Sequence, residues 1–185
     1  MLKAIARETI AVLGAGGPLG FPIARTIVLA GMDVRAWDKA RGRSEPLAGH
    51  GAYVSDSALE AARGAGIVLT TISDPAELVA VMEDGVLDQM RAGDPEYHAI
   101  WLQMAAIGEE HTQRCIRLAG GYGIGFVDAQ VVGTGREAAR GRLIIVESGP
   151  QEVRPRVQPV FDALGYRTVR AGQAGAAARL KQEGR

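Results

Sequence analysis

The sequence has little of several features that mark whole classes of protein. Its 185 residues include one cysteine, Cys115, and aromatic residues make up only 5% of the chain. A single cysteine excludes a disulfide framework and is typical of a reducing compartment, so we expect a cytoplasmic protein. Cys115 falls in a helix predicted over Glu109–Ala119, where we expect it to be a small buried residue rather than a nucleophile.

Excess charge of one sign and long apolar runs are also missing. Twenty-one basic residues balance 21 acidic ones, which argues against a nucleic-acid or membrane-surface protein. Arg25 interrupts the longest apolar helical stretch, so no membrane span is expected. His50, His98 and His111 have no metal-ligand spacing relative to one another or to Cys115, and no metal is expected.

Short apolar runs alternate with amphipathic stretches along the whole chain. This alternation predicts an α/β fold, a doubly wound and mostly parallel sheet with helices on both faces. The predicted strands are Ile10–Leu13, Val34–Trp37, Ala52–Val54, Ile67–Thr71, Ala99–Gln103, Phe126–Ala129, Leu143–Val146 and Arg167–Val169. A loop is predicted over Met90–Glu96, where glycine, aspartate and proline follow one another.

Two helices have readable boundaries. Asp74 is the predicted N-cap of one, with Pro75 in its first position and Glu77 three residues after the cap. The other is predicted over Gln151–Leu164, with Gly165 as its C-cap.

A glycine-rich turn joins the first predicted strand to a helix predicted over Leu19–Ala30. Such a turn brings backbone N–H groups and a helix N-terminus close to a phosphate, and an acid at the end of the second strand meets a ribose hydroxyl. The pattern therefore predicts a Rossmann dinucleotide-binding turn, the alternative being an ordinary tight turn without a ligand. The residues expected at the cofactor are Gly14, Gly16, Gly17, Leu19, Gly20 and Asp38.

Longer stretches resemble the β-hydroxyacid dehydrogenase family, which includes 3-hydroxyisobutyrate dehydrogenase and the cofactor domain of 6-phosphogluconate dehydrogenase. The resemblance extends from Ile10 to about Lys181. Residues 68–74 resemble the loop over the nicotinamide ribose, and residues 128–134 resemble the substrate loop. Residues 175–181 resemble the approach to the catalytic lysine.

The resemblance implies hydride transfer between NAD or NADP and a small β-hydroxyacid. It implies Lys181 as the group that accepts the hydroxyl proton, a role that requires a lowered lysine pKa. It also places Ile72, Ser73 and Ala105 at the cofactor, and Val132, Gly133 and Thr134 at the substrate. Residues 1–170 would form the Rossmann domain, and residues 171–185 would begin an interdomain helix.

The chain departs from the family pattern in several places. The glycine turn has one more residue between Gly16 and Gly20, Val132 replaces a serine, and Ala105-Ala106 replaces a Ser-Thr pair. The family's C-terminal all-helical domain is absent from these residues, and Arg185 stands where the family has an asparagine. A non-catalytic dinucleotide-binding or interaction module and an imine-reductase-like enzyme therefore remain as alternatives. An apolar face prepared for the missing domain could drive self-association into a homo-oligomer.

The choice between the two coenzymes is open in the sequence. Asp38 would accept a hydrogen bond from the ribose 2′-OH and repel a 2′-phosphate, which favours NAD. Lys39, Arg41 and Arg43 follow it and could bind the phosphate of NADP.

Overall fold

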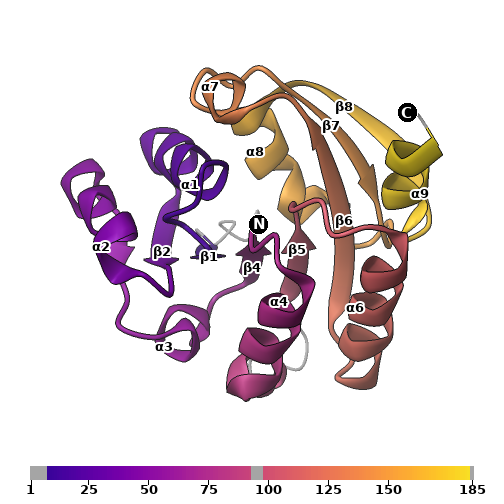
Figure 1. Cartoon of the computed structure of the whole chain (residues 1–185), viewed down its shortest axis with the longest axis horizontal. Coiled ribbons are helices and arrows are strands. Elements are labelled where there is room, and N and C mark those ends of the chain that lie inside the picture. Colours follow the sequence, from indigo (N-terminus) through magenta and orange to yellow (C-terminus); the bar gives the residue numbers. More distant parts are fainter. Residues whose placement is uncertain (1–7, 93–97, 184–185) are drawn as a thin grey trace, which may run out of the picture.

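Eight strands form one sheet in the computed structural model, which describes residues 8–92 and 98–183 (Figure 1). The strands are β1 (Thr9–Leu13), β2 (Asp33–Trp37), β3 (Tyr53–Val54), β4 (Ile67–Thr70), β5 (Ile100–Gln103), β6 (Gly125–Val132), β7 (Leu143–Ser148) and β8 (Gly165–Gly172). They lie in the order β3-β2-β1-β4-β5-β6-β7-β8, and every neighbouring pair is parallel except β6 with β7. All eight predicted strands and the mostly parallel, doubly wound fold are confirmed.

Neighbouring residues of a strand point to opposite faces of the sheet, and in the central strands both sets of residues are apolar. Both faces of the sheet are therefore apolar. In β1, Ile10 and Val12 belong to one buried cluster, whereas Ala11 and Leu13 belong to the other. The first cluster is covered by α1 (Gly20–Leu29), η1 (Glu45–His50), α7 (Gly135–Ala138) and α8 (Arg154–Leu164). The second is covered by α3 (Ala58–Ala62), α4 (Pro75–Val81), η2 (Met82–Val86), α5 (Leu87–Arg91) and α6 (Glu109–Gly121). A short helix, α2 (Arg41–Ser44), follows β2.

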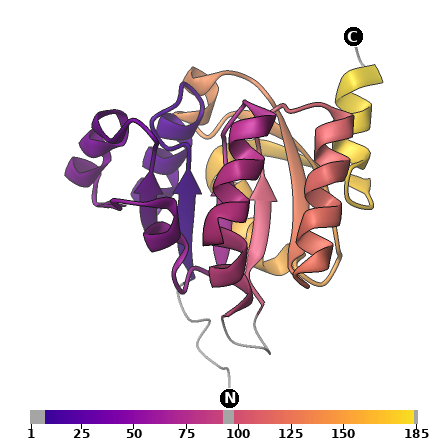
Figure 2. The ribbon, with the colours of Figure 1, turned by 60° about the horizontal axis from the view of Figure 1, so that its bottom comes forward.

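The chain reverses its direction of winding at β1, which lies between β2 on one side and β4 on the other. In open α/β sheets, ligands bind outside the carboxyl ends of the strands at such a switch point. The last helix, α9 (Ala176–Glu183), lies at the other end of the sheet, against β6, β7 and β8 and beside α6 (Figure 2).

The predicted start of α4 is confirmed. The Asp74 carboxylate accepts hydrogen bonds from the N–H groups of Ala76, at 2.9 Å, and Glu77, at 3.3 Å. A kink that was not predicted follows this helix, where Gly85 adopts a φ of 90°. That backbone conformation is open to glycine and separates α4 from α5.

Gly165 is the C-cap of α8, as predicted, and its N–H donates to the Phe161 carbonyl. This residue has φ −128° and ψ 148°, which is extended backbone, and it begins β8 instead of forming a left-handed helix cap. A Cβ atom at Gly165 would lie 2.8 Å from the Leu143 carbonyl oxygen, so close approach to β7 is what requires glycine here. The helix before it also begins three residues later than predicted, at Arg154.

Cys115 lies in α6 and is fully buried, as predicted. Burial raises the pKa of its thiol to about 11. Met90, which was predicted to begin a loop, is instead a buried residue of α5, and the predicted turn residues at 93–95 lie outside the described part of the chain. Within residues 8–92 and 98–183, no helix has the length and apolar character needed to cross a bilayer.

Candidate functional site

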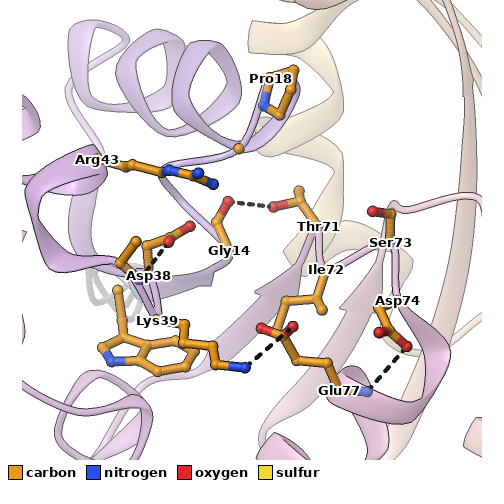
Figure 3. Close-up of a pocket in the computed structure, with 13 residues that line it drawn as sticks. Gly14, Pro18, Asp38, Lys39, Arg43, Thr71, Ile72, Ser73, Asp74 and Glu77 are labelled. Atoms are coloured by element: carbon orange, nitrogen blue, oxygen red, sulfur yellow. Dashed lines mark hydrogen bonds and ion pairs between the residues drawn. The ribbon is translucent and has the colours of Figure 1, made fainter.

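A cavity of about 450 Å³ opens at the carboxyl ends of β1, β2 and β4 (Figure 3). It is therefore at the switch point of the sheet. Its lining combines the glycine turn, the end of β2 with α2, and the loop that leads from β4 into α4. The lining residues are Gly14, Gly17, Pro18, Trp37, Asp38, Lys39, Ala40, Arg43, Thr71, Ile72, Ser73, Asp74 and Glu77.

The glycine turn is packed tightly against the loop after β4. The Thr71 hydroxyl donates to the Gly14 carbonyl at 3.0 Å, and Gly14 adopts a φ of 88°. A Cβ atom at Gly20 would lie 2.0 Å from the Gly14 oxygen and 2.5 Å from the Thr71 hydroxyl oxygen. The Gly14 carbonyl is held by the turn, and Gly20 is fixed as the first residue of α1. Because neither can move far, only glycine fits at position 20.

Asp38 holds the turn from the β2 side. Its carboxylate accepts one hydrogen bond from the Gly16 N–H and one from the Ala40 N–H, each at 2.9 Å. Gly16 is needed for this approach, because a Cβ there would lie 2.4 Å from the Cβ of Arg43. Each carboxylate oxygen has further acceptor capacity, so the acid is fixed in place and can still bind a hydroxyl group.

The additional residue of the turn is absorbed before α1. The Gly17 N–H donates to the Gly14 carbonyl at 3.1 Å, and the Phe21 N–H donates to the Gly17 carbonyl at 3.0 Å. Among the described residues, the N–H groups of Leu19 and Gly20 have no hydrogen-bond partner. The start of α1 therefore has unpaired donors of the kind that a pyrophosphate site uses, although Gly20 is buried and neither residue lines the cavity.

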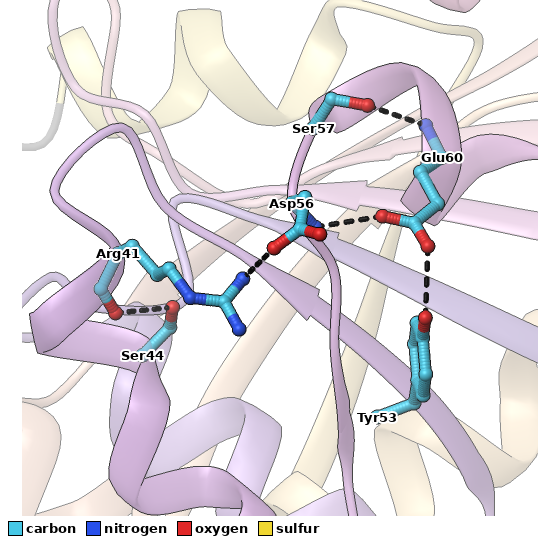
Figure 4. A network of polar contacts seen from close by, with 6 residues as sticks. All are labelled: Arg41, Ser44, Tyr53, Asp56, Ser57 and Glu60. Atoms are coloured by element: carbon cyan, nitrogen blue, oxygen red, sulfur yellow. Dashed lines mark hydrogen bonds and ion pairs between the residues drawn. The ribbon is translucent and has the colours of Figure 1, made fainter.

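The three basic residues after Asp38 have different surroundings. Arg41 forms an ion pair with Asp56, within a polar network that also joins Tyr53 to Glu60 (Figure 4). That ion pair engages Arg41, and the residue does not line the cavity. Lys39 and Arg43 do line it, as Figure 3 shows, although the Lys39 Nζ lies 3.8 Å from a Glu77 carboxylate oxygen.

In the predicted substrate loop, one of the backbone N–H groups already has a hydrogen-bond partner within the chain. Val132, the last residue of β6, is exposed, and Gly133 adopts a φ of 132°. Thr134 caps α7, and its N–H donates to the Glu137 carboxylate at 2.9 Å. The Thr134 hydroxyl donates to the same carboxylate, and this hydrogen bond and the one from the Thr134 N–H lower the pKa of Glu137. Of the two backbone donors expected for a substrate carboxylate, the one at Thr134 is therefore engaged.

Lys181 lies on α9, beside the strand that ends in this loop. Its ammonium group donates to the Val131 carbonyl at 3.1 Å. Partial burial lowers the pKa of Lys181, and the nearby charge of Asp128 opposes that shift. A lowered pKa is the direction that a proton acceptor requires.

The structure brings some of the predicted site residues together and leaves others apart. Among the predicted cofactor residues, those that line the cavity are Gly14, Gly17, Asp38, Ile72 and Ser73. Gly16, Leu19 and Gly20 belong to the turn behind it. Ala105 is 3% exposed and is not part of the lining. Lys181 and the loop at 132–134 form a second group, on β6 and α9.

Sequence reasoning missed two acidic residues of these sites. Glu77 was interpreted only as a helix-start residue, although one turn of helix after Asp74 places it on the same cavity. Glu137 follows Thr134 by three residues, a spacing typical of a capping box, and this signal was available.

Comparison with known proteins agrees with this geometry. Residues 9–172 match the family described as the NAD binding domain of 6-phosphogluconate dehydrogenase. The chain belongs to this family. An uncharacterized oxidoreductase, YfjR, of Bacillus subtilis is 30% identical over 166 residues, which are 89% of this chain and 56% of that protein. The 3-hydroxyisobutyrate dehydrogenase of Pseudomonas aeruginosa is 30% identical over 169 residues, or 90% of this chain and 55% of the enzyme.

Several solved structures share the fold. The 3-hydroxyisobutyrate dehydrogenase of Mycobacterium tuberculosis with L-serine has a TM-score of 0.85 and 29% identity, covering 94% of this chain and 57% of that one. Imine reductase structures from Myxococcus stipitatus, with NAD+ in one and NADP+ in the other, have TM-scores of 0.85 at 22% and 21% identity, covering 95% of this chain and 59% of theirs.

The chain spans just over half the length of the curated relatives that it matches. The predicted resemblance is confirmed, and the domain is an NAD(P)-binding domain of the hydroxyacid dehydrogenase type.

Proposed function

We propose that this chain is the coenzyme-binding part of an oxidoreductase that prefers NAD and acts on a small acid with a β-hydroxyl group. The observation that carries the proposal is Asp38, which the N–H groups of Gly16 and Ala40 hold at the mouth of the cavity. A fixed carboxylate there suits a ribose 2′-OH and repels a 2′-phosphate. The engagement of Arg41 by Asp56 and of Lys39 by Glu77 supports the same preference.

We assign the pyrophosphate to the N–H groups of Leu19 and Gly20, at the start of α1, with Gly14, Gly16 and Gly17 giving close backbone approach. Ile72, Ser73 and Ala105 would lie toward the nicotinamide. A bound nicotinamide supplies the hydride acceptor. Lys181 would take the hydroxyl proton, since its pKa is lowered by partial burial.

The substrate would lie against Val132, Gly133 and Thr134. Because the Thr134 N–H already serves Glu137, the N–H of Gly133 is the better candidate donor for a substrate carboxylate. We also propose a cytoplasmic location, which the single buried cysteine supports. Self-association is a further proposal, supported by the exposed apolar side chains of Val132 and Leu180.

A second candidate is a dinucleotide-binding module without catalysis. The engaged Thr134 N–H and the missing hydroxyl groups at Val132 and Ala105 favour it. An imine-reductase-like activity is a third candidate, which Lys181 disfavours and the shared fold favours.

Calorimetry with NAD+ and NADP+, followed by an absorbance assay of nicotinamide reduction with short β-hydroxyacids, tests the proposal. We expect NAD+ to bind and turnover to fall by about 10²- to 10⁴-fold in Lys181→Ala, the range of a lost general base. Arg179→Ala, on the same helix, is the matched control. Binding without turnover would support the module, and no heat with either coenzyme would overturn the proposal.

A further inference from the structure

Asp128 is a fully buried carboxylate in the middle of β6. A charged group in such a place is costly unless hydrogen bonds satisfy it. One of its oxygens accepts from the Gln130 side-chain amide at 2.6 Å, and the other accepts from the Ala178 N–H at 2.8 Å. Ala178 lies in the first turn of α9, so the carboxylate binds the positive end of this helix.

A second side chain holds the same helix end. The hydroxyl of Ser148, on β7, accepts from the Ala177 N–H at 3.1 Å. Ser148 is the partner of Asp128 in the antiparallel register of β6 and β7. Two residues that are paired on the neighbouring strands β6 and β7 therefore bind successive N–H groups of α9. This arrangement fixes both the position and the direction of the helix.

The position of Lys181 follows from this attachment. Lys181 is three residues after Ala178 on α9, and it contacts Val131, which is three residues after Asp128 on β6. Three residues advance a helix by about 4.5 Å and a strand by about 10 Å. The extended lysine side chain covers the difference and reaches the Val131 carbonyl, next to the exposed end of β6 at Val132.

We propose that Asp128 is a positioning residue for Lys181: its carboxylate holds the first turn of α9 on the sheet and so sets where the lysine ammonium group lies. The proposal rests on the proposed function for the importance of Lys181, but the placement itself can be tested without coenzyme or substrate. Residues 128–134 resemble a substrate loop, and the structure directs the first side chain of that segment to the helix instead.

Asp128 also acts on Lys181 through its charge. Partial burial lowers the pKa of Lys181, and Asp128 raises it, so the two effects oppose each other. Burial raises the pKa of Asp128 itself, against the hydrogen bonds from Gln130 and Ala178. Among the described residues, the Cys115 thiol on α6 is a further titratable group that interacts with Asp128. Position and charge are separable, because asparagine keeps an acceptor oxygen and loses the charge.

The lysine content of the chain makes the measurement direct. The sequence has three lysines, Lys3, Lys39 and Lys181. Reductive ¹³C-methylation keeps their positive charge and gives each lysine an NMR signal whose pH titration reports its own pKa. Amide hydrogen exchange at Ala177 and Ala178 reports how firmly α9 is held. Lys39, which is 75% exposed, serves as the internal reference.

In Asp128→Ala we expect exchange at Ala178 to accelerate at least about tenfold, as a lost charged hydrogen bond implies. We expect the Lys181 midpoint to rise, because the loosened helix releases the lysine from the burial that lowers its pKa. In Asp128→Asn we expect exchange at Ala178 to stay near the wild-type rate, because the asparagine oxygen can accept from the Ala178 N–H and the Gln130 amide can turn to accept from the new NH₂ group. The Lys181 midpoint should fall, because the charge is lost. Ser148→Ala should accelerate exchange at Ala177 without the downward shift of Lys181 seen in Asp128→Asn.

If Asp128→Ala folds and leaves both the exchange rates and the Lys181 titration unchanged, the proposal is wrong. If that variant does not fold, Asp128→Leu takes its place, because leucine removes the acceptor and fills the space with an apolar side chain. Unchanged exchange at Ala178 and an unchanged Lys181 titration in that variant would overturn the proposal equally. A failure of coenzyme binding or of turnover would refute the proposed function and leave these NMR results standing, so the two outcomes are distinguishable.

Discussion

Replacing Asp38 by asparagine should weaken the preference of this domain for NAD over NADP. The carboxylate is held by two backbone N–H groups at the edge of the cavity, so it cannot turn away from a 2′-phosphate. Two unit charges 4 Å apart repel each other by about 1 kcal/mol in water and about 4 kcal/mol near a protein surface. We therefore expect the ratio of the NADP and NAD dissociation constants to fall by roughly 5- to 150-fold, which corresponds to about 1–3 kcal/mol.

The ratio, rather than either affinity, is the quantity to measure. Both partners of Asp38, at Gly16 and Ala40, are donors, whereas an asparagine side chain offers one oxygen and one NH₂ group. One hydrogen bond is therefore lost in the variant, at a cost of about 1 kcal/mol that both coenzymes share. Calorimetric titrations with each coenzyme, at low and at high ionic strength, separate this shared loss from the change in charge.

Asp162→Asn, on the exposed face of α8, is the matched control and should leave the ratio unchanged. The change caused by Asp38→Asn should also shrink as salt is added, because exposed charges are screened. An Asp38→Asn domain that binds NAD normally and discriminates against NADP as strongly as wild type would refute the assignment of this acid to the ribose.

Two other predictions concern single side chains. Glu77→Gln should release Lys39 from its exposed ion pair and improve NADP binding by up to about fivefold, the limit for such a pair; calorimetry that finds an unchanged NADP affinity would mean that Lys39 does not reach the phosphate. Cys115, with a thiol pKa raised to about 11 by burial, should react with a thiol reagent such as DTNB at least about 100-fold more slowly at pH 8 than a thiol of ordinary pKa. Because the folded-state pKa is the higher one, the thiol stabilises the fold below pH 9, and this contribution is lost as the pH rises toward 11. Rapid stoichiometric labelling of the folded chain would contradict this.

The strands that were easiest to predict are those buried on both faces. β1 and β4 are continuous apolar runs, so their limits are nearly the same in the sequence and in the structure. β6 is twice as long as predicted because Asp128 and Gln130 interrupt the apolar pattern, although each is satisfied by hydrogen bonds inside the fold. Local sequence cannot reveal that the partner of Asp128 is a helix fifty residues away.

The length of β8 was also predicted too short, for a different reason. It pairs only with β7, at the edge of the sheet, and its surface residues include the exposed side chain of Tyr166. An edge strand in contact with solvent needs no alternating apolar pattern, so its ends cannot be located from hydrophobicity. In the site, too, some features could be predicted from local sequence and others depend on the folded structure. Glycines and Asp38 could be predicted from spacing, whereas the pairing of Lys39 with Glu77 depends on two loops that meet only in the folded chain.

The glycine turn and the start of α7 are in close contact. The lengthened turn brings the Pro18 carbonyl oxygen to within 2.4 Å of where a Cβ of residue 135 would stand, so only Gly135 permits this approach. The Thr26 hydroxyl, on α1, adds a hydrogen bond to the Ala138 carbonyl at 3.0 Å, which ties α7 to the helix that follows the turn. A larger residue at position 135 would therefore collide with the turn, so replacing Gly135 by alanine should displace α7 from α1 and lower the stability of the fold.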